Sequence, residues 1–202
     1  MAPAESRDEA STAKRAAVRA AVLQATEGLL RDGASYADLN IELIARRAGI
    51  SRTAFYFYFR DKRDVLMRLT TNVNERIYRE ADVWFSGTGE PAEEMQRALA
   101  SIAAVYLDHG VLVRAIVEVS AYDDDVGRLW RGLMARFAEA TCTRIEAERA
   151  AGQSRAWPPQ ATAFALCWMT ERALYQQLVQ ERPPMDELVD ALAGIWLRAV
   201  YG

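Results

Sequence analysis

Five consecutive aromatic residues, Phe55 to Phe59, follow a glycine by a few positions and constrain this part of the chain more than any other feature. One short helix cannot bury all five rings, because successive side chains of a helix point in different directions. Before the run, Ala45 is small enough for two helices to touch, and Gly49 tolerates the positive φ of a tight turn. After the turn, three apolar residues can pack inward: Ile50, Phe55 and Phe59. The spacing predicts a helix-turn-helix whose short second helix is capped by Ser51.

The outward face of this second helix would carry four residues that are unusual together on a solvated surface: Arg52, Thr53, Tyr56 and Phe57. An exposed arginine at the start of such a helix suits bidentate hydrogen bonding to guanine O6 and N7 in the major groove. Tyrosine hydroxyls, and a lysine at the start of the next helix, suit phosphate oxygens. The alternative, that the aromatic run is ordinary core, would require all five rings to face inward. The pattern therefore favours contact with double-stranded DNA.

Charge is distributed unevenly along the chain, although its formal net charge is only -3. Residues 40–63 hold six basic and two acidic residues, which gives a local balance of +4. From Leu66 onward, fourteen basic residues stand against nineteen acidic ones, which gives -5. A basic segment ahead of an acidic body can approach phosphates while the remaining surface keeps the protein in solution.

Apolar residues recur at helical spacing along the chain, and no stretch alternates apolar and polar residues as a half-buried strand would. The sequence predicts an all-α fold of about nine helices. Residues 1–11 are expected to form a mobile tail and residues 12–61 a three-helix DNA-binding domain of the helix-turn-helix type. Residues 62–202 are expected to form a second helical domain that starts with a connecting helix over 62–85. Two glycines and a proline within 86–91 mark the clearest break in the pattern.

Composition and spacing exclude several classes of protein and site. A helical di-metal oxidase needs paired glutamates and Glu-x-x-His motifs, whereas His109 is the single histidine and no nucleophile stands beside a base. No enzyme activity, cofactor or metal is therefore expected, and the acidic run Asp123 to Asp125 is interpreted as a helix N-cap. Cys142 and Cys167 are interpreted as reduced, packed thiols. The chain has no secretory signal and no run of eighteen apolar residues, which predicts a cytoplasmic protein without a membrane span.

The stretch from Ile44 to Lys62 resembles the DNA-binding domain of the tetracycline-repressor (TetR) family. The shared pattern is a small residue, glycine, a hydrophobic residue and serine, followed after a short gap by an aromatic pair, phenylalanine and a capped lysine. The resemblance covers roughly residues 18–69. It implies that Arg52 and Thr53 approach base edges and that Phe57 packs against the DNA backbone or a thymine methyl group. The residues implied to hold phosphates are Ser51, Tyr56, Tyr58 and Lys62.

The rest of the chain is similar to the ethionamide-repressor subgroup of that family, for example at Thr170-Glu171-Arg172 and Ile195-Trp196. The resemblance implies a C-terminal domain with an elongated apolar tunnel for a small hydrophobic effector. The candidate lining residues are Tyr106, Trp130, Met134, Phe137, Trp168, Thr170 and Trp196. Cys167 and Thr170 stand where the subgroup has amides, which implies a less polar or differently shaped ligand and one hydrogen bond from Thr170. Plain core packing is the alternative for these aromatic residues.

One chain offers one recognition helix, whereas two such helices must enter successive major grooves about 34–36 Å apart. A twofold homodimer on a palindromic operator is therefore expected, with the last two helices, about Pro159 to Gln180 and Met185 to Tyr201, as its four-helix interface. The sequence thus predicts a transcriptional regulator of the bacterial cytosol, associated with the nucleoid, that acts as a repressor and is released by a small apolar ligand. Regulation by a protein partner or by nothing, and activation in place of repression, stay open as alternatives.

Overall fold

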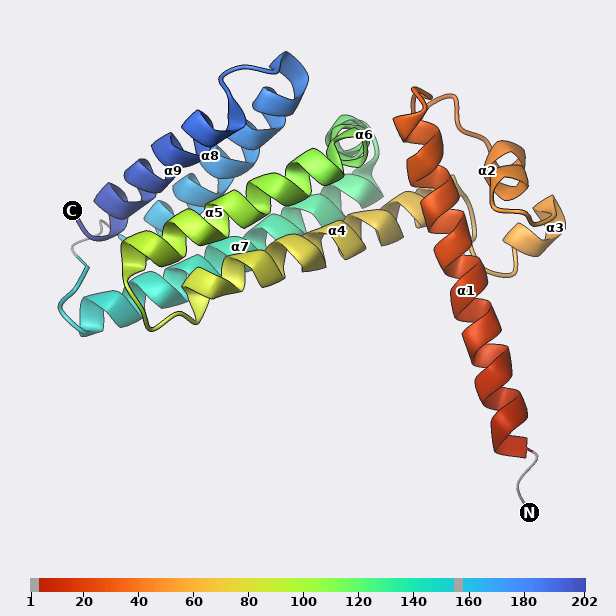
Figure 1. The fold of residues 1–202 in the computed structure, drawn as a ribbon, viewed down its shortest axis with the longest axis horizontal. Helices are drawn as coiled ribbons and strands as arrows, with labels where there is room; N and C mark the ends of the chain where they lie inside the picture. The colour runs from red at the N-terminus through yellow and green to blue at the C-terminus, as the bar shows by residue number, and fades with distance from the viewer. Residues whose placement is uncertain (1–3, 155–157) are drawn as a thin grey trace. The chain divides into compact units, whose positions relative to one another are not determined.

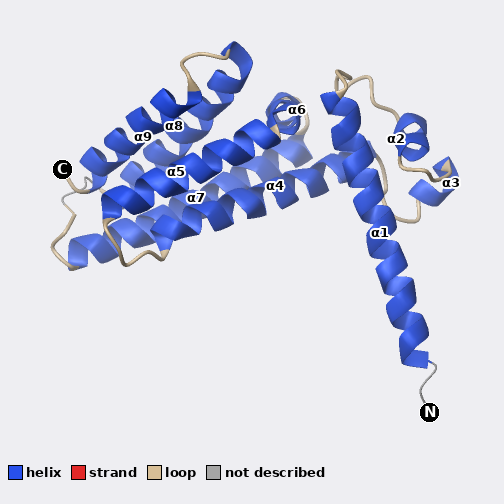
Figure 2. Ribbon diagram, in the orientation of Figure 1, coloured by secondary structure: helices blue, strands red, loops and turns tan. Residues whose placement is uncertain are grey.

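The computed structural model describes residues 4–154 and 158–202, with side chains from residue 12 onward. Over these residues it consists of nine α-helices joined by loops, without a strand (Figures 1 and 2). The predicted all-α class and the predicted number of helices are therefore confirmed. The chain divides into two compact units, one up to Thr70 and one from Thr71.

The first unit contains three helices and the first turns of a fourth: α1 (Ala4–Arg31), α2 (Ile41–Arg47), α3 (Arg52–Phe55) and α4 (Lys62–Phe85). Helix α2 packs against both α1 and α3. The core of this unit is built from apolar side chains of all four helices and of the loop before α2, among them Val22, Leu29, Tyr36, Leu39, Ile44, Phe55 and Leu66. These residues bury the inner faces of the helices, so that the short α3 is held in place although four residues alone would not form a stable helix.

Two boundaries in this part of the chain differ from the prediction. Helix α1 begins at Ala4, so the segment expected to be a tail through Ser11 is helical from residue 4, while residues 1–3 lie outside the described part. Alanine and charged residues of high helix propensity extend α1 in this direction. The two units meet inside α4 rather than before Lys62, because the buried residues Val65 and Leu66 place the first turns of this helix in the first unit.

The second unit contains the remainder of α4 and five further helices: α5 (Pro91–Asp108), α6 (Gly110–Ser120), α7 (Asp124–Ala150), α8 (Pro159–Gln180) and α9 (Met185–Val200). Helix α8 packs on α7 and α9, and α9 also packs on α5 (Figure 1). His109 lies at the junction where α6 turns away from α5 by 84°. Asp123 caps α7, as predicted: its Oδ1 accepts hydrogen bonds from the N–H groups of Asp125 and Val126 at 3.0 and 3.1 Å.

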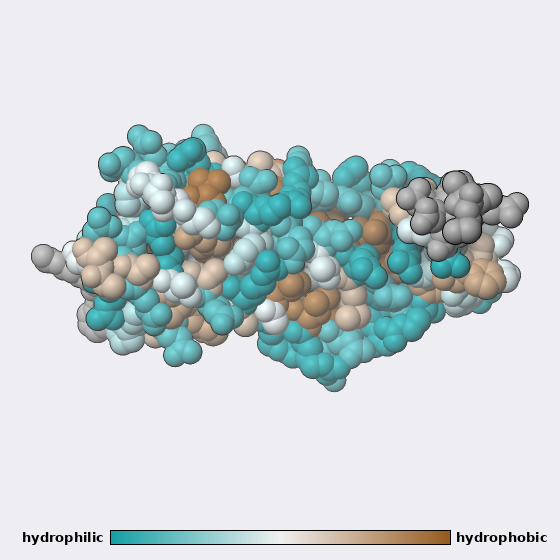
Figure 3. All heavy atoms as spheres, turned by 90° about the horizontal axis from the view of Figure 1, so that it is seen from below, coloured by the Kyte–Doolittle hydropathy of each residue, from teal (hydrophilic) through white to brown (hydrophobic). Residues whose placement is uncertain are grey.

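Apolar residues are mostly inside, and the face drawn in Figure 3 is largely hydrophilic with a few apolar patches. Among the described helices, none by itself combines the length and the apolar composition needed to cross a membrane. Within the described part of the chain, α5 and α6 taken together have this length and composition, as a pair bent at the junction between them.

A buried ion cluster ties α7 to the loop between α4 and α5. Arg144 of α7 forms ion pairs with Glu148, at 2.5 Å, and with Glu94 of α5, at 3.9 Å, and its guanidinium donates to the carbonyl of Gly87. The guanidinium also lies 5.7 Å from the ring centroid of Trp84. The three charged side chains are 5–12% exposed. A Cβ atom at Gly87 would lie 2.1 Å from the Glu94 carboxylate, so this close approach requires glycine.

Candidate functional site

Local signals in the sequence position the second helix of the motif, α3. Gly49 has a φ of +71° in the turn, where any residue with a Cβ atom would be strained. Ser51 is the N-cap of α3, and its Oγ accepts a hydrogen bond from the Ala54 N–H at 3.0 Å. Phe55 and Phe59 are buried, and their ring centroids are 5.7 Å apart. One face of α3 is thus fixed to the core, and the other face points outward.

The outward face presents the predicted group of DNA-contacting residues. Arg52 and Thr53 are exposed, while Tyr56 is 50% and Phe57 81% exposed. These four side chains surround one shallow hollow of the surface. Tyr58 is half-buried beside them. An exposed phenylalanine next to an arginine adds nothing to the core, whereas a rigid, capped helix with such a face suits recognition in a DNA groove.

Lys62, for which a phosphate contact is predicted, is engaged within the protein in this structure. Its ammonium donates hydrogen bonds to the backbone carbonyls of Tyr36, Ala37 and Leu39 at 3.0, 3.0 and 2.7 Å, which uses all three N–H donors of a lysine. The ammonium also lies 4.8 Å from the centroid of the Tyr36 ring. Partial burial lowers the pKa of Lys62, and the charge of Asp38 opposes this shift. Lys62 therefore ties the start of α4 to the loop between α1 and α2.

We expect Lys62→Ala to lower the free energy of unfolding by roughly 1–3 kcal/mol, because three carbonyls lose a charged donor. The slope of operator affinity against salt concentration should stay unchanged, since no phosphate contact is lost. Urea denaturation and a salt series of binding measurements check both points. Lys14→Ala, at an exposed lysine of α1, is the control and should change stability by less than about 0.5 kcal/mol. A slope reduced by about one unit at unchanged stability would restore the phosphate role.

The second unit contains a cavity that is bordered by residues of α4, α5, α7, α8 and α9 and has a volume of about 70 Å³. Six aromatic rings form much of its wall: Trp84, Phe85, Tyr106, Trp130, Phe137 and Trp196. Two of them, Trp84 and Trp196, meet edge to face with ring centroids 5.5 Å apart. A mostly apolar cavity between helices, with a few polar groups in its wall, is the usual form of a small-molecule site.

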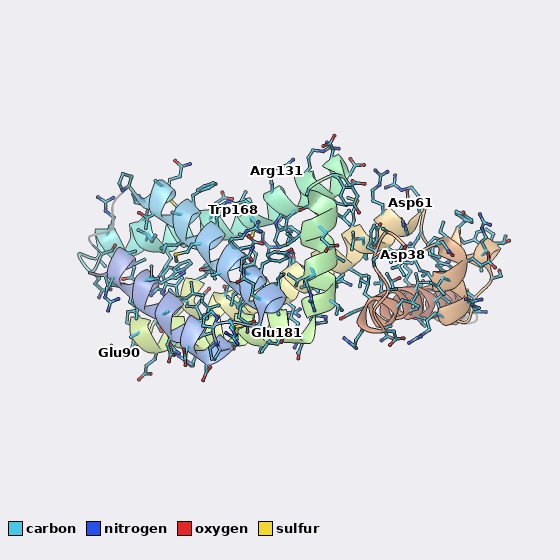
Figure 4. All side chains as sticks on the ribbon, turned by 90° about the horizontal axis from the view of Figure 1, so that it is seen from above. Asp38, Asp61, Glu90, Arg131, Trp168 and Glu181 are labelled. Carbon is cyan, nitrogen blue, oxygen red and sulfur yellow. The ribbon has the colours of Figure 1, made fainter. Side chains whose placement is uncertain are left out.

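Six of the seven predicted effector residues border this cavity: Tyr106, Trp130, Met134, Phe137, Thr170 and Trp196. Thr170 Oγ1 accepts a hydrogen bond from Trp196 Nε1 at 2.8 Å, so its oxygen is already engaged within the protein. Trp168 does not border the cavity. It is half-buried on α8 (Figure 4), with its ring centroid 6.2 Å from that of the exposed Phe164. Trp168 and Thr170 are two positions apart on one helix and therefore face in different directions.

The wall that α4 contributes was not predicted. Asn74, Ile77, Ala81 and Trp84 all border the cavity. Their spacings of three, four and three residues form one helical stripe, a signal that the sequence does contain. The stripe makes this helix part of the cavity wall.

Glu171 of α8 is a further residue of the wall that was not predicted. It is 3% exposed, and neither carboxylate oxygen has a hydrogen-bond partner among the described residues. Burial raises the pKa of the Glu171 carboxyl, and the nearby charge of Arg172 opposes this shift. Burial and the charge of Glu171 raise the pKa of the Tyr106 hydroxyl, and burial raises the pKa of the Cys167 thiol to about 11. Tyr106 and Cys167 are therefore neutral parts of the wall at neutral pH.

Two family models match the chain. Residues 95–202 match the model described as "Transcriptional regulator EthR, C-terminal domain", and residues 22–69 match "Bacterial regulatory proteins, tetR family". The exposed face of α3 lies within the second match, and most of the cavity wall lies within the first.

Curated relatives cover nearly the whole chain. The HTH-type transcriptional regulator EthR of Mycobacterium tuberculosis (strain ATCC 25618 / H37Rv) is 34% identical over 191 residues, which are 90% of this chain and 86% of the relative. The protein of the same name from Mycolicibacterium smegmatis is 30% identical over 192 residues, with 91% and 87% covered.

Solved structures share the fold at lower identity. The structure of SmeT, the repressor of the Stenotrophomonas maltophilia multidrug efflux pump SmeDEF, has a TM-score of 0.74 at 18% identity and covers 91% of this chain and 90% of its own. Regulatory protein TetR from Rhodobacter sphaeroides has a TM-score of 0.69 at 21% identity, with 89% and 97% covered. At these identities the likeness concerns the fold alone.

Proposed function

Because the chain belongs to the TetR family of bacterial transcriptional regulators and has a C-terminal domain of the EthR type, we propose that it is a repressor that leaves a palindromic operator when a small apolar molecule fills its cavity. Membership of this family places it among DNA-binding regulators rather than enzymes. The observation that carries the proposal is the exposed face of α3, with Arg52 at its start. The proposed site of action is operator DNA in the nucleoid.

In the proposed complex, α3 enters the major groove with Arg52 and Thr53 at the base edges. Phe57, the most exposed aromatic residue of the motif, packs against a thymine methyl group or the backbone. The hydroxyl groups of Ser51, Tyr56 and Tyr58 bind phosphates. Lys62 takes no part, because its ammonium is used within the protein.

Regulators of this family bind operator DNA as dimers, and we propose α8 and α9 as the dimer interface. Large apolar side chains are exposed on these two helices: Phe164, Val179 and Ile195. The half-buried Trp168 adjoins the first of them. A second copy of this surface would cover these side chains and form a four-helix bundle around a twofold axis.

The dimer would have one conformation that binds the operator and one that does not. A ligand can release the DNA only if it binds the second conformation more tightly than the first. A nearly complete switch needs about 5.5 kcal/mol of such difference. A cavity of the observed composition can bury an apolar molecule, and binding there would raise the melting temperature by mass action. If no apolar compound raised the melting temperature, regulation by a protein partner would become the better explanation.

We expect Arg52→Ala to weaken operator binding by about 1–3 kcal/mol per half-site and to relax the preference at one base pair in each half-site, because each subunit loses a bidentate guanine contact. Footprinting on the region upstream of the protein's own gene, followed by binding to single-base variants of the protected inverted repeat, measures both effects. Arg31→Ala, which removes an exposed arginine of α1 that pairs with Glu27, is the control and should leave the base preference unchanged. An equal loss on all sequences would assign Arg52 to a phosphate instead.

A further inference from the structure

Glu171 is a buried acidic side chain to which no other described residue donates a hydrogen bond. It borders the cavity, and both of its oxygens are buried without a hydrogen bond among the described residues. Such a group is costly to keep ionised, unless a partner reaches it. A buried acid with this cost and no structural task is a candidate for ligand binding.

The one ion pair of Glu171 among the described residues is weak. Nε of Arg172 lies 3.7 Å from Oε2, which is too far for a hydrogen bond. The Arg172 side chain is 52% exposed, and its guanidinium lies 5.1 Å from the ring centroid of Tyr175. Water therefore screens much of its charge, and Arg172 compensates the buried carboxylate only in part.

The surroundings of Glu171 in the cavity favour a cation. Aromatic rings from four helices border the same space, and the π faces of indole and phenol attract positive charge once it is removed from water. The nearby polar groups are uncharged, since Cys167 and Tyr106 stay neutral and Thr170 carries a hydroxyl. No cationic side chain is among the residues that border the described cavity.

We propose that the effector of this cavity is a cationic amphiphile, an apolar molecule with one protonated amine or quaternary ammonium group that pairs with the carboxylate of Glu171. The inference rests on the proposed function and narrows its ligand from any small apolar molecule to a positively charged one. A neutral alcohol would donate one hydrogen bond but would give an ionised Glu171 no counter-charge. An anion of the same shape would be repelled.

Three probes with the same phenylbutyl skeleton test whether the cavity prefers a positive charge: 4-phenylbutylamine, 4-phenylbutan-1-ol and 4-phenylbutyrate. Isothermal titration with the full chain should show the amine binding more tightly than the alcohol by about tenfold or more, and the carboxylate more weakly than both. Bound amine should also release the operator at lower concentration than the alcohol does. This ranking uses the unaltered protein, so it does not depend on the folding of any variant.

Glu171→Gln removes the charge at nearly constant volume. We expect it to abolish the preference for the amine while leaving the affinity for the alcohol within about twofold. The control is Glu187→Gln, at an exposed glutamate of α9 that does not border the cavity. This control should keep the preference of the unaltered protein.

The outcomes separate the inference from the function on which it rests. An alcohol that binds as tightly as the amine, or a preference that survives in Glu171→Gln, overturns the cationic ligand but leaves an apolar effector in place. If none of the three probes gives a titration heat or raises the melting temperature, the cationic ligand is overturned. The same result also contradicts the effector role of the cavity. Operator binding by the same preparation shows in either case that the DNA-binding function is intact.

Discussion

Phe164→Glu is expected to convert the dimer into monomers and to weaken operator binding by at least about 100-fold. Phe164 is 60% exposed on α8, within the proposed interface. A glutamate there would remove an apolar ring from the proposed interface and would have to lose its water when the subunits associate. Two linked half-site contacts gain about 10²–10⁴-fold over one, and this gain is lost when the subunits separate. Light scattering should show a fall from twice the chain mass to the chain mass of 22.6 kDa.

The control for this experiment is Leu107→Glu, at a residue of α5 that is 55% exposed and lies outside the proposed interface. It introduces the same charge at similar exposure, and the variant should remain a dimer with full operator affinity. A dimer that persists in Phe164→Glu would show that the subunits meet through another surface.

Arg144→Met is expected to lower the free energy of unfolding by about 3–5 kcal/mol. The substitution keeps the apolar stem but leaves Glu94 and Glu148 buried without their cation, which is the costly way to break a buried ion pair. It also removes the hydrogen bond to the carbonyl of Gly87, so the loop between α4 and α5 loses its attachment to α7. Urea denaturation followed by circular dichroism measures the change.

Arg128→Met is the matched control, because Arg128 also lies on α7 and pairs with an aspartate but is 64% exposed. An exposed pair contributes about 0–1 kcal/mol, so this variant should unfold almost like the original protein. The double variant Arg144→Met/Glu148→Gln should be more stable than Arg144→Met alone, since one of the stranded charges is gone. If Arg144→Met and Arg128→Met lowered the free energy of unfolding by the same amount, the buried cluster would contribute no more than a surface pair.

The helix-turn-helix was predictable because its signals are local. Gly49 sets the turn and Ser51 caps α3 through atoms only a few residues away, so the sequence contains the whole arrangement. The inward packing of Phe55 and Phe59 follows from the same helical spacing. The all-α class was predictable for a similar reason, since helical periodicity repeats along the chain.

The roles that depend on distant segments were not predictable in this way. Lys62 looks like a phosphate ligand until the fold brings its ammonium to carbonyls 23 to 26 residues earlier in the chain. Trp168 shares a helix with Thr170, and only the packing of α8 decides which of the two borders the cavity. Helical spacing places Glu171 on the same face of α8 as Cys167, but the sequence does not reveal that its carboxylate is buried without a hydrogen bond.

The cavity wall has a practical consequence for the study of this protein. Three of its five tryptophans, Trp84, Trp130 and Trp196, border the cavity. Indole emission changes in intensity and wavelength when the polarity around the ring changes. Ligand binding in the cavity can therefore be followed in unlabelled protein by the intrinsic fluorescence of these tryptophans.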